Sequence, residues 1–175
     1  MVATSGARAE RGAVAVEFAL ILPILVMLLL GITTAGLSYS QSIGLANAVR
    51  EGSRFGATAD AASDDWAADV ISRVRTTQFD DSSTPPDTAV CVQLYKQGSG
   101  PVANRSECEA GDPSLPALSM PTSNKFPAVP ATIDAGQCVV RVIAARPFSI
   151  NIVIAPIYNG VAVKGAVARY ERDSC

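Results

Sequence analysis

The chain has 175 residues, no histidine and a formal net charge of −2 at pH 7, with 49% hydrophobic and 17% charged residues. This length accommodates one ordinary domain and an anchoring segment. The absence of histidine excludes His-based catalytic triads and zinc sites that need imidazole. The basic residues are scattered, so no nucleic-acid footprint is visible. P-loop, dinucleotide and nucleophile-elbow motifs are also absent from the sequence. We therefore expect no enzyme activity, metal, cofactor or nucleic-acid partner.

An apolar run near the start of the chain, residues 13–32, reads AVAVEFALILPILVMLLLGI. A helix of about 20 residues, rising about 1.5 Å per residue, spans the roughly 30 Å hydrocarbon core of a bilayer. Arg8 and Arg11 precede the run, whereas residues 33–42 carry no charge. This bias predicts a cytoplasmic N-terminus and an extracytoplasmic remainder. A cleavable secretory signal and a plain anchor are the alternatives for the segment.

A carboxylate lies near the start of this apolar run. Glu17 follows Gly12 by five residues and precedes Phe18. A carboxylate in lipid costs a few kcal/mol unless it is interfacial or paired, so simple tolerance near the cytosolic face is one interpretation. The string of residues 11–18, RGAVAVEF, has the glycine, four-residue gap, glutamate and aromatic residue of a type IV prepilin-like processing site. It resembles in particular the TadE-like family, the minor pseudopilins of bacterial tight-adherence (Tad) pili.

The resemblance extends to residues 47–57, NAVREGSRFGA, and has a weak echo at residues 166–171, AVARYE. It covers about residues 10–59. The resemblance implies that a membrane prepilin peptidase cuts after Gly12 and leaves Ala13 as the new N-terminus. It also implies that Glu17, with Phe18 beside it, acts in assembly by meeting the free amine of a neighbouring subunit. The implied partners are membrane lipid, the prepilin peptidase, other pilin-like subunits and Tad assembly proteins.

The helix is expected to continue beyond the membrane to Ala59, because residues 33–59 contain no proline. Glycines weaken this prediction by about 1 kcal/mol each relative to alanine, so a break near Gly52 is an alternative. Arg50 and Arg54 stand four residues apart on one helix face. They are candidates for contacts with lipid headgroups or with acidic side chains of partners, and a solvated face is the alternative. A partial apolar stripe along this stalk comprises Leu37, Ile43, Leu45, Ala48 and Val49.

Beyond the stalk, a second helix is predicted to open at Ser63, with Asp64 and Asp65 in its first turn and Trp66 as a core anchor. Residues 88–95, 137–145 and 161–171 are predicted strands, and Arg146 with Pro147 should end the second one. Residues 104–130 are rich in proline, glycine and serine and predict a long exposed loop. Three valines of the last strand, Val161, Val163 and Val167, should face one way.

All four cysteines follow the apolar run and lack C-x-x-C spacing. An even number of cysteines outside the cytoplasm indicates two disulfides, with three possible connectivities. If the last two strands form an antiparallel pair, the start of one lies near the end of the other. This arrangement favours Cys138 with Cys175 and leaves Cys91 with Cys108. Free thiols are the alternative that a cytosolic domain would require.

Together these patterns predict an α+β fold with a long N-terminal transmembrane and stalk helix, a second short helix and a small antiparallel sheet outside the membrane. The expected organisation is a cytosolic leader (1–12), the membrane and stalk helix (13–59) and an extracytoplasmic domain (60–175). The predicted function is that of a TadE-like minor pseudopilin in a bacterial cell membrane; the alternative is a membrane-anchored binding module or adhesin. Whether the subunit enters the filament, primes it or sits at its tip stays open.

Overall fold

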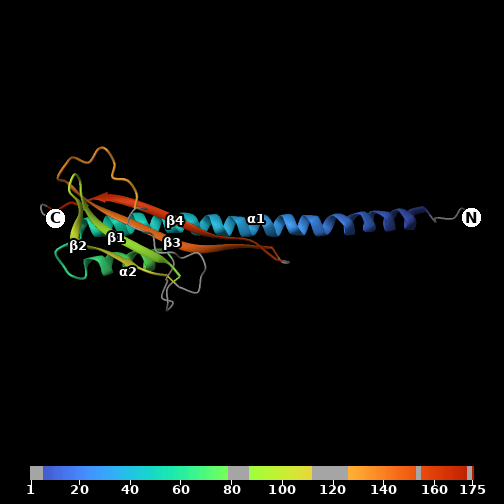
Figure 1. Cartoon of the computed structure of the whole chain (residues 1–175). Coiled ribbons are helices and arrows are strands. Elements are labelled where there is room, and N and C mark those ends of the chain that lie inside the picture. Colours follow the sequence, from blue (N-terminus) through green and yellow to red (C-terminus); the bar gives the residue numbers. More distant parts are fainter. Residues whose placement is uncertain (1–5, 79–86, 112–125, 153–154, 173–174) are drawn as a thin grey trace, which may run out of the picture. The chain divides into compact units, whose positions relative to one another are not determined.

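The computed structural model describes residues 6–78, 87–111, 126–152, 155–172 and 175. The chain divides into two compact units: Met1–Ser38 with Ser149–Tyr158, and Tyr39–Phe148 with Asn159–Cys175. The α+β class, with its long N-terminal helix, short second helix and four-stranded sheet, confirms the prediction from the sequence (Figure 1). The elements are α1 (Gly6–Thr58), α2 (Trp66–Gln78), β1 (Ala89–Lys96), β2 (Gly100–Glu109), β3 (Cys138–Ile152) and β4 (Ala155–Arg169).

Helix α1 continues without a break past both residues that were candidates for interrupting it. Pro23 lies inside the helix, where it removes one backbone hydrogen bond, a loss that membrane helices tolerate well. The helix also continues through Gly52, so the predicted alternative of a break there is wrong. The prediction of an apolar stripe along the stalk is confirmed only in part. Leu37 is 62% exposed and Ile43 is 46% exposed, whereas Leu45, Ala48 and Val49 are buried.

The sheet of the second unit has the strand order β2-β1-β3-β4. Strand β1 is antiparallel to both of its neighbours, and its Cys91 lies opposite Cys108 of β2 and Ile143 of β3. Strands β3 and β4 follow each other in the chain and are neighbours in the sheet. An antiparallel sheet of this kind buries one face more completely than the other.

One face of the sheet packs against α2 and the C-terminal part of α1 (Figure 1). Side chains of a strand alternate between faces, and the buried set follows that period. Trp66 is 1% exposed, which confirms its predicted role as a core anchor. The core of this unit includes Leu45, Ala48 and Val49 of α1, Trp66, Val70, Ile71 and Val74 of α2, Val90, Val92 and Leu94 of β1, and Val140, Val142 and Ala144 of β3.

The opposite face of the sheet is covered by the segment that precedes β3. The guanidinium of Arg141 lies 4.9 Å from the ring centroid of Tyr95 and 5.2 Å from that of Phe126. Its Nε donates a hydrogen bond of 3.0 Å to the carbonyl of Pro127. Burial lowers the pKa of Arg141 from its ordinary value, and Tyr95 opposes that shift. The guanidinium stays charged and fastens the covering segment through cation–π contacts.

Strand β2 was not expected, and the predicted loop over residues 104–130 is therefore wrong at its start. An edge strand has one neighbour, so most side chains of β2 are exposed and the alternation that reveals a buried strand is absent. Asn104 has a φ of 58° and lies opposite the register irregularity between Gln93 and Tyr95. Such a bulge with polar flanks discourages pairing with another chain. The part of the predicted loop over residues 112–125 lies outside the described residues.

The second helix begins later than predicted. The backbone N–H of Asp69 donates to the carbonyl of Asp65 at 2.9 Å. Asp65 therefore holds the N-cap position that the sequence analysis gave to Ser63. Asp69 is the acidic residue in the first turn of α2, and Arg75 is the basic residue in its last turn. The charges still complement the helix dipole, but with a later register than expected.

The last two strands are longer than predicted. Strand β3 continues through Pro147 to Ile152, because its pairing with β1 ends at Ala145. Beyond that point the missing N–H of Pro147 removes no hydrogen bond to β1. Val161, Val163 and Val167 share one face of β4 by the two-residue period of a strand, and the other face packs on the core. Val163 is 50% exposed, while Ala162, Ala166 and Ala168 pack against the core.

Helices α1 and α2 approach closely at two glycines. A Cβ atom added to Gly52 would lie 2.3 Å from Cγ2 of Val74, and one added to Gly56 would lie 2.9 Å from Cγ2 of Val70. Real Cβ atoms do not come this near, so glycine at these positions permits the packing. The glycines that weaken the helix by propensity are therefore the residues that let it pack.

We predict that Gly52→Ala lowers the free energy of unfolding by about 1 kcal/mol, because overpacking costs about 1–3 kcal/mol and alanine returns about 1 kcal/mol of helix propensity. The measurement is denaturant unfolding of the detergent-solubilised chain, followed by fluorescence of its single tryptophan, Trp66. Gly36→Ala is the matched control, since nothing lies within 4 Å of that Cβ. Combining Gly52→Ala with Val74→Ala should relieve the clash. Equal stability of wild type and Gly52→Ala would contradict the packing described above.

Candidate assembly site

The N-terminal part of α1 presents apolar side chains that no other described residue covers. Thirteen large apolar side chains between Val14 and Ile32 are exposed, with exposed fractions from 44% to 72%. Burying one such side chain fully is worth about 1.5–3 kcal/mol, so covering the set is worth on the order of 10 kcal/mol or more. This is comparable with the whole stability of a domain. The helix therefore needs an apolar environment, and it is the one helix among the described residues that is long and apolar enough to cross a membrane.

Glu17 and Phe18 lie on this exposed part of α1. Phe18 is 58% exposed, and Glu17 is also exposed. Residues 13–49 contain no lysine or arginine. Among the described residues, Glu17 has no ion pair. A cation for this carboxylate must therefore come from outside this stretch of α1.

Beyond the apolar run, α1 carries hydroxyl side chains. Their hydrogen bonds are made to backbone carbonyls of the same helix. Oγ1 of Thr33 donates to the carbonyl of Leu29 at 2.8 Å, Oγ1 of Thr34 to Leu30 at 2.9 Å, and Oγ of Ser38 to Thr34 at 3.0 Å. Such bonds to the preceding turn remove the need for water around a hydroxyl. The apolar environment can therefore extend past Ile32 without leaving these donors unpaired.

Arg50 and Arg54 are exposed on the side of α1 that faces away from the core. The intervening Glu51 forms an ion pair of 3.2 Å with Arg73 of α2. Arg73 also lies 5.9 Å from the centroid of the Phe55 ring. Among the described residues, neither Arg50 nor Arg54 has an ion pair. The structure thus leaves both arginines available, as their proposed role as contacts requires.

The C-terminal end of α1 is capped by residues from distant parts of the chain. A helix leaves its last four carbonyls without internal partners. Here the carbonyl of Phe55 accepts from Ala59 N at 2.9 Å. The carbonyls of Gly56, Ala57 and Thr58 accept from Trp66 Nε1, Glu171 N and Arg172 Nε at 3.0, 3.0 and 3.2 Å respectively. All four carbonyls are therefore satisfied.

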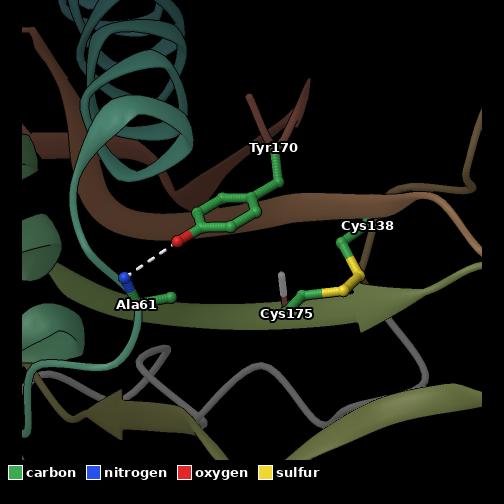
Figure 2. Close-up of a disulfide and its surroundings, with 4 residues drawn as sticks. All are labelled: Ala61, Cys138, Tyr170 and Cys175. Carbon is green, nitrogen blue, oxygen red and sulfur yellow. Dashed lines mark hydrogen bonds between the residues drawn. A yellow bond between two sulfur atoms is a disulfide. The ribbon is translucent and has the colours of Figure 1, made fainter. Parts of the chain in front are cut away.

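Tyr170 fixes the turn that follows α1. Its hydroxyl accepts a hydrogen bond of 3.0 Å from Ala61 N (Figure 2). It also donates one of 3.3 Å to the carbonyl of Ala59. Its own backbone N–H donates to the carbonyl of Cys138 at 2.8 Å. The tyrosine is 6% exposed, so these groups cannot exchange their partners for bulk water. Tyr170 thus joins the end of β4 to the end of α1 and to the start of β3.

Two disulfides crosslink the domain: one joins β1 to β2, and the other joins the start of β3 to Cys175. Cys91 is joined to Cys108 on directly opposed residues of β1 and β2, with a Cα–Cα distance of 4.1 Å. Cys138 is joined to Cys175, with a Cα–Cα distance of 6.4 Å (Figure 2). These are the two pairs that the sequence analysis favours. The second pair ties down the segment that caps α1. Each such bond stabilises a domain by about 2–4 kcal/mol.

The sequence analysis did not find the contact between residues 170–172 and the end of α1. The sequence offers one hint, the weak echo at residues 166–171 of the family to which residues 47–57 were compared. The structure brings the ends of these two segments together through Glu171 N and the carbonyl of Ala57. A single sequence does not show which distant segment satisfies a helix end, because backbone donors leave no mark in composition.

The comparison with known families agrees with this geometry. A single apolar helix and a small disulfide-bonded α+β domain fit a membrane-anchored protein. The family model described as TadE: TadE-like protein matches residues 12–54. The resemblance inferred from the sequence is confirmed over this range, which contains Gly12, Glu17, Arg50 and Arg54. No curated protein and no solved structure matches the chain.

We predict that Tyr170→Phe lowers the free energy of unfolding by about 1–3 kcal/mol, because it leaves the buried Ala61 N–H without its acceptor. The denaturant midpoint, followed by Trp66 fluorescence, measures the effect. Tyr39→Phe is the control, since Tyr39 is 70% exposed, and it should change stability by less than about 0.5 kcal/mol. Equal effects of the two substitutions would show that the hydroxyl of Tyr170 contributes nothing specific.

Proposed function

We propose that the chain is a TadE-like minor pseudopilin, a membrane-anchored structural component of a Tad pilus assembly or secretion machinery. The match over residues 12–54 supports a pilus-associated, minor pilin-like role. The observation that carries the proposal is the apolar, exposed segment of α1 over residues 13–32. This segment directly follows Gly12 and carries Glu17 near its start. A helix of this kind is suited to move from lipid into a bundle of similar helices.

The proposed processing step removes Met1–Gly12. The bond between Gly12 and Ala13 lies within α1, so a peptidase must unwind the helix locally before it cuts. Glycine is about 1 kcal/mol less favourable than alanine in a helix, and its missing side chain lets an extended backbone approach a catalytic cleft closely. Both properties favour cleavage at this point. The chain is the substrate of this reaction, not its catalyst.

Cleavage would also supply the cation that Glu17 lacks. The new N-terminus at Ala13 carries an α-amine, and residues 13–49 offer no other positive side chain. A carboxylate and an amine are each costly in lipid, and pairing offsets much of that cost. Pairing between neighbouring subunits would fix the axial register of their helices. This explains in physical terms why a charge is retained in an apolar run.

The proposed topology has a cytoplasmic leader and an extracytoplasmic domain. Arg8 and Arg11 precede the apolar run, and the first charged residue after it is Arg50. Basic residues are retained on the cytoplasmic side. The two disulfides lie in the other part of the chain, and such bonds persist in oxidising compartments. Charge bias and cysteine chemistry therefore support the same orientation.

We predict that the chain loses Met1–Gly12 in cells with an active prepilin peptidase. N-terminal sequencing of the membrane-extracted protein should then begin at Ala13. Gly12→Leu should block this processing, because a branched side chain prevents the close approach, whereas Gly31→Ala should be processed normally. Retention of the leader in wild-type protein would reject the pseudopilin assignment and would favour the alternative of a membrane-anchored binding module.

Glu17→Ala should be processed and inserted but should lose co-assembly with pilin-like subunits, because the amine of the neighbouring subunit then has no partner. We expect at least a tenfold loss, which corresponds to about 1.4 kcal/mol. Co-purification of epitope-tagged subunits with sheared pili measures this loss. Glu107→Gln, which removes an exposed carboxylate from β2, is the control and should co-assemble normally. Normal co-assembly of Glu17→Ala would leave Glu17 as a tolerated interfacial residue.

A further inference from the structure

One exposed face of α1 in the second unit combines apolar and basic side chains. With 3.6 residues per turn, the positions concerned lie within an arc of about 80°. They lie opposite the buried Leu45, Gly52 and Gly56. We call this surface the arginine face, and it consists of the exposed residues Tyr39, Ile43, Asn47, Arg50 and Arg54.

Within the part of the chain that the structure describes, no ion pair neutralises the two arginines of this face. Glu51, the carboxylate nearest in sequence, pairs with Arg73 instead. Like charges four residues apart destabilise a helix by about 0.2–0.5 kcal/mol, so their presence on one face carries a small cost. A planar guanidinium binds a carboxylate through two parallel hydrogen bonds. The arginine face therefore fits a partner surface with two carboxylates at matching spacing.

A surface with that spacing exists on this chain. Asp65 and Asp69 are exposed and stand four residues apart, at the N-cap and in the first turn of α2. Among the described residues, neither aspartate has an ion pair. A shallow groove of about 230 Å³ adjoins these residues of α2, and it is lined by Ala68, Ile71, Ser72, Thr76 and the Arg75–Glu109 ion pair. We call this surface the acidic face, and it consists of Asp65, Ala68, Asp69, Ser72 and Thr76.

The two faces match when the helices run antiparallel. Arg54 then lies opposite Asp65 and Arg50 opposite Asp69, since both pairs are separated by four residues. Ile43 lies seven residues before Arg50, and Thr76 lies seven residues after Asp69. The same register therefore places the 46% exposed Ile43 at the groove beside Thr76. Two ion pairs and one apolar contact follow from a single alignment.

The antiparallel direction is the one that two copies in a single membrane allow. Within one chain, α2 runs antiparallel to α1, because Gly52 lies against Val74 and Gly56 against Val70. If the α1 helices of two copies are parallel, α2 of one copy is antiparallel to α1 of the other. The proposed alignment differs from the internal one by seven residues, which corresponds to an axial stagger of about 10 Å between copies.

We propose that the arginine face of one copy binds the acidic face of a second copy, so that copies associate head to tail with an axial stagger. Such a contact uses two different surfaces, and its repetition produces an open array rather than a closed pair. The inference deepens the proposed pilin-like function and rests on it. It names the partner surface that the arginines of residues 47–57 recognise.

The test uses the full chain in its native cells, with photoreactive benzoylphenylalanine at position 47. The alignment places this position opposite Ser72, so the expected crosslink joins it to a peptide of a second copy within residues 65–76. Crosslinked peptides are identified by mass spectrometry. A crosslink to phospholipid, to another protein, or to a different part of a second copy would overturn the proposal, as would the absence of a crosslink.

Charge exchange makes the test specific. The Arg50→Glu/Arg54→Glu variant and the Asp65→Lys/Asp69→Lys variant should each lose at least tenfold in crosslink yield, because like charges then face each other. Co-expression of the two variants should restore the yield to within about threefold of wild type, since each then offers the complement of the other. Failure of this restoration would overturn the proposal. Glu107→Lys is the control and should leave the yield unchanged.

Two further readouts separate other causes of a lost crosslink. Lysine at the N-cap of α2 costs helix stability, so Asp65→Asn/Asp69→Asn serves as a second variant. It keeps capping ability at position 65, and it should reduce the yield while Trp66 fluorescence stays native. Removal of Met1–Gly12 is measured in the same cells. A processed leader without the crosslink rejects only this inference, whereas a retained leader rejects the proposed function independently of the crosslink.

Discussion

The end of helix α1 is the constraint on which the folded domain depends. Two of its last four residues, Gly56 and Ala57, are buried, and a buried carbonyl without a partner costs about 1–3 kcal/mol. Local residues satisfy only part of this demand, and the backbone of Glu171 and the side chain of Arg172 supply the rest. The end of the chain must therefore return to the end of its first helix. This return positions Tyr170 and brings Cys175 to Cys138.

The segment at residues 47–57 performs two tasks on opposite sides of one helix. Gly52 and Gly56 face α2, where only hydrogen fits in place of a side chain. Arg50 and Arg54 face away from the core and add nothing to its packing. The small residues explain how the domain holds the helix, and the arginines are free for contacts outside the chain. The family match covers residues 47–54 of this segment, and these include Gly52 and both arginines.

The features predicted correctly from the sequence are those that local chemistry dictates. The apolar run, the continuous stalk and Trp66 follow from helical period and from the absence of proline, and the two cysteine pairs follow from strand order. The failures also have physical causes. Strand β2 lacks alternation because it lies at an edge, and β3 continues through Pro147 because its pairing with β1 has already ended. The cap on α1 depends on which distant segment returns to the helix end, and no residue pattern reveals that.

Under the proposed function, the charges of α1 would make this helix an interface along much of its length. After Gly12 it carries four charged residues, namely Glu17, Arg50, Glu51 and Arg54. Of these, only Glu51 has an ion pair among the described residues. A helix that served merely as an anchor would gain nothing from a carboxylate in lipid or from two like charges on one face. Each is a small cost in the isolated chain, and each becomes favourable when another subunit supplies the opposite charge.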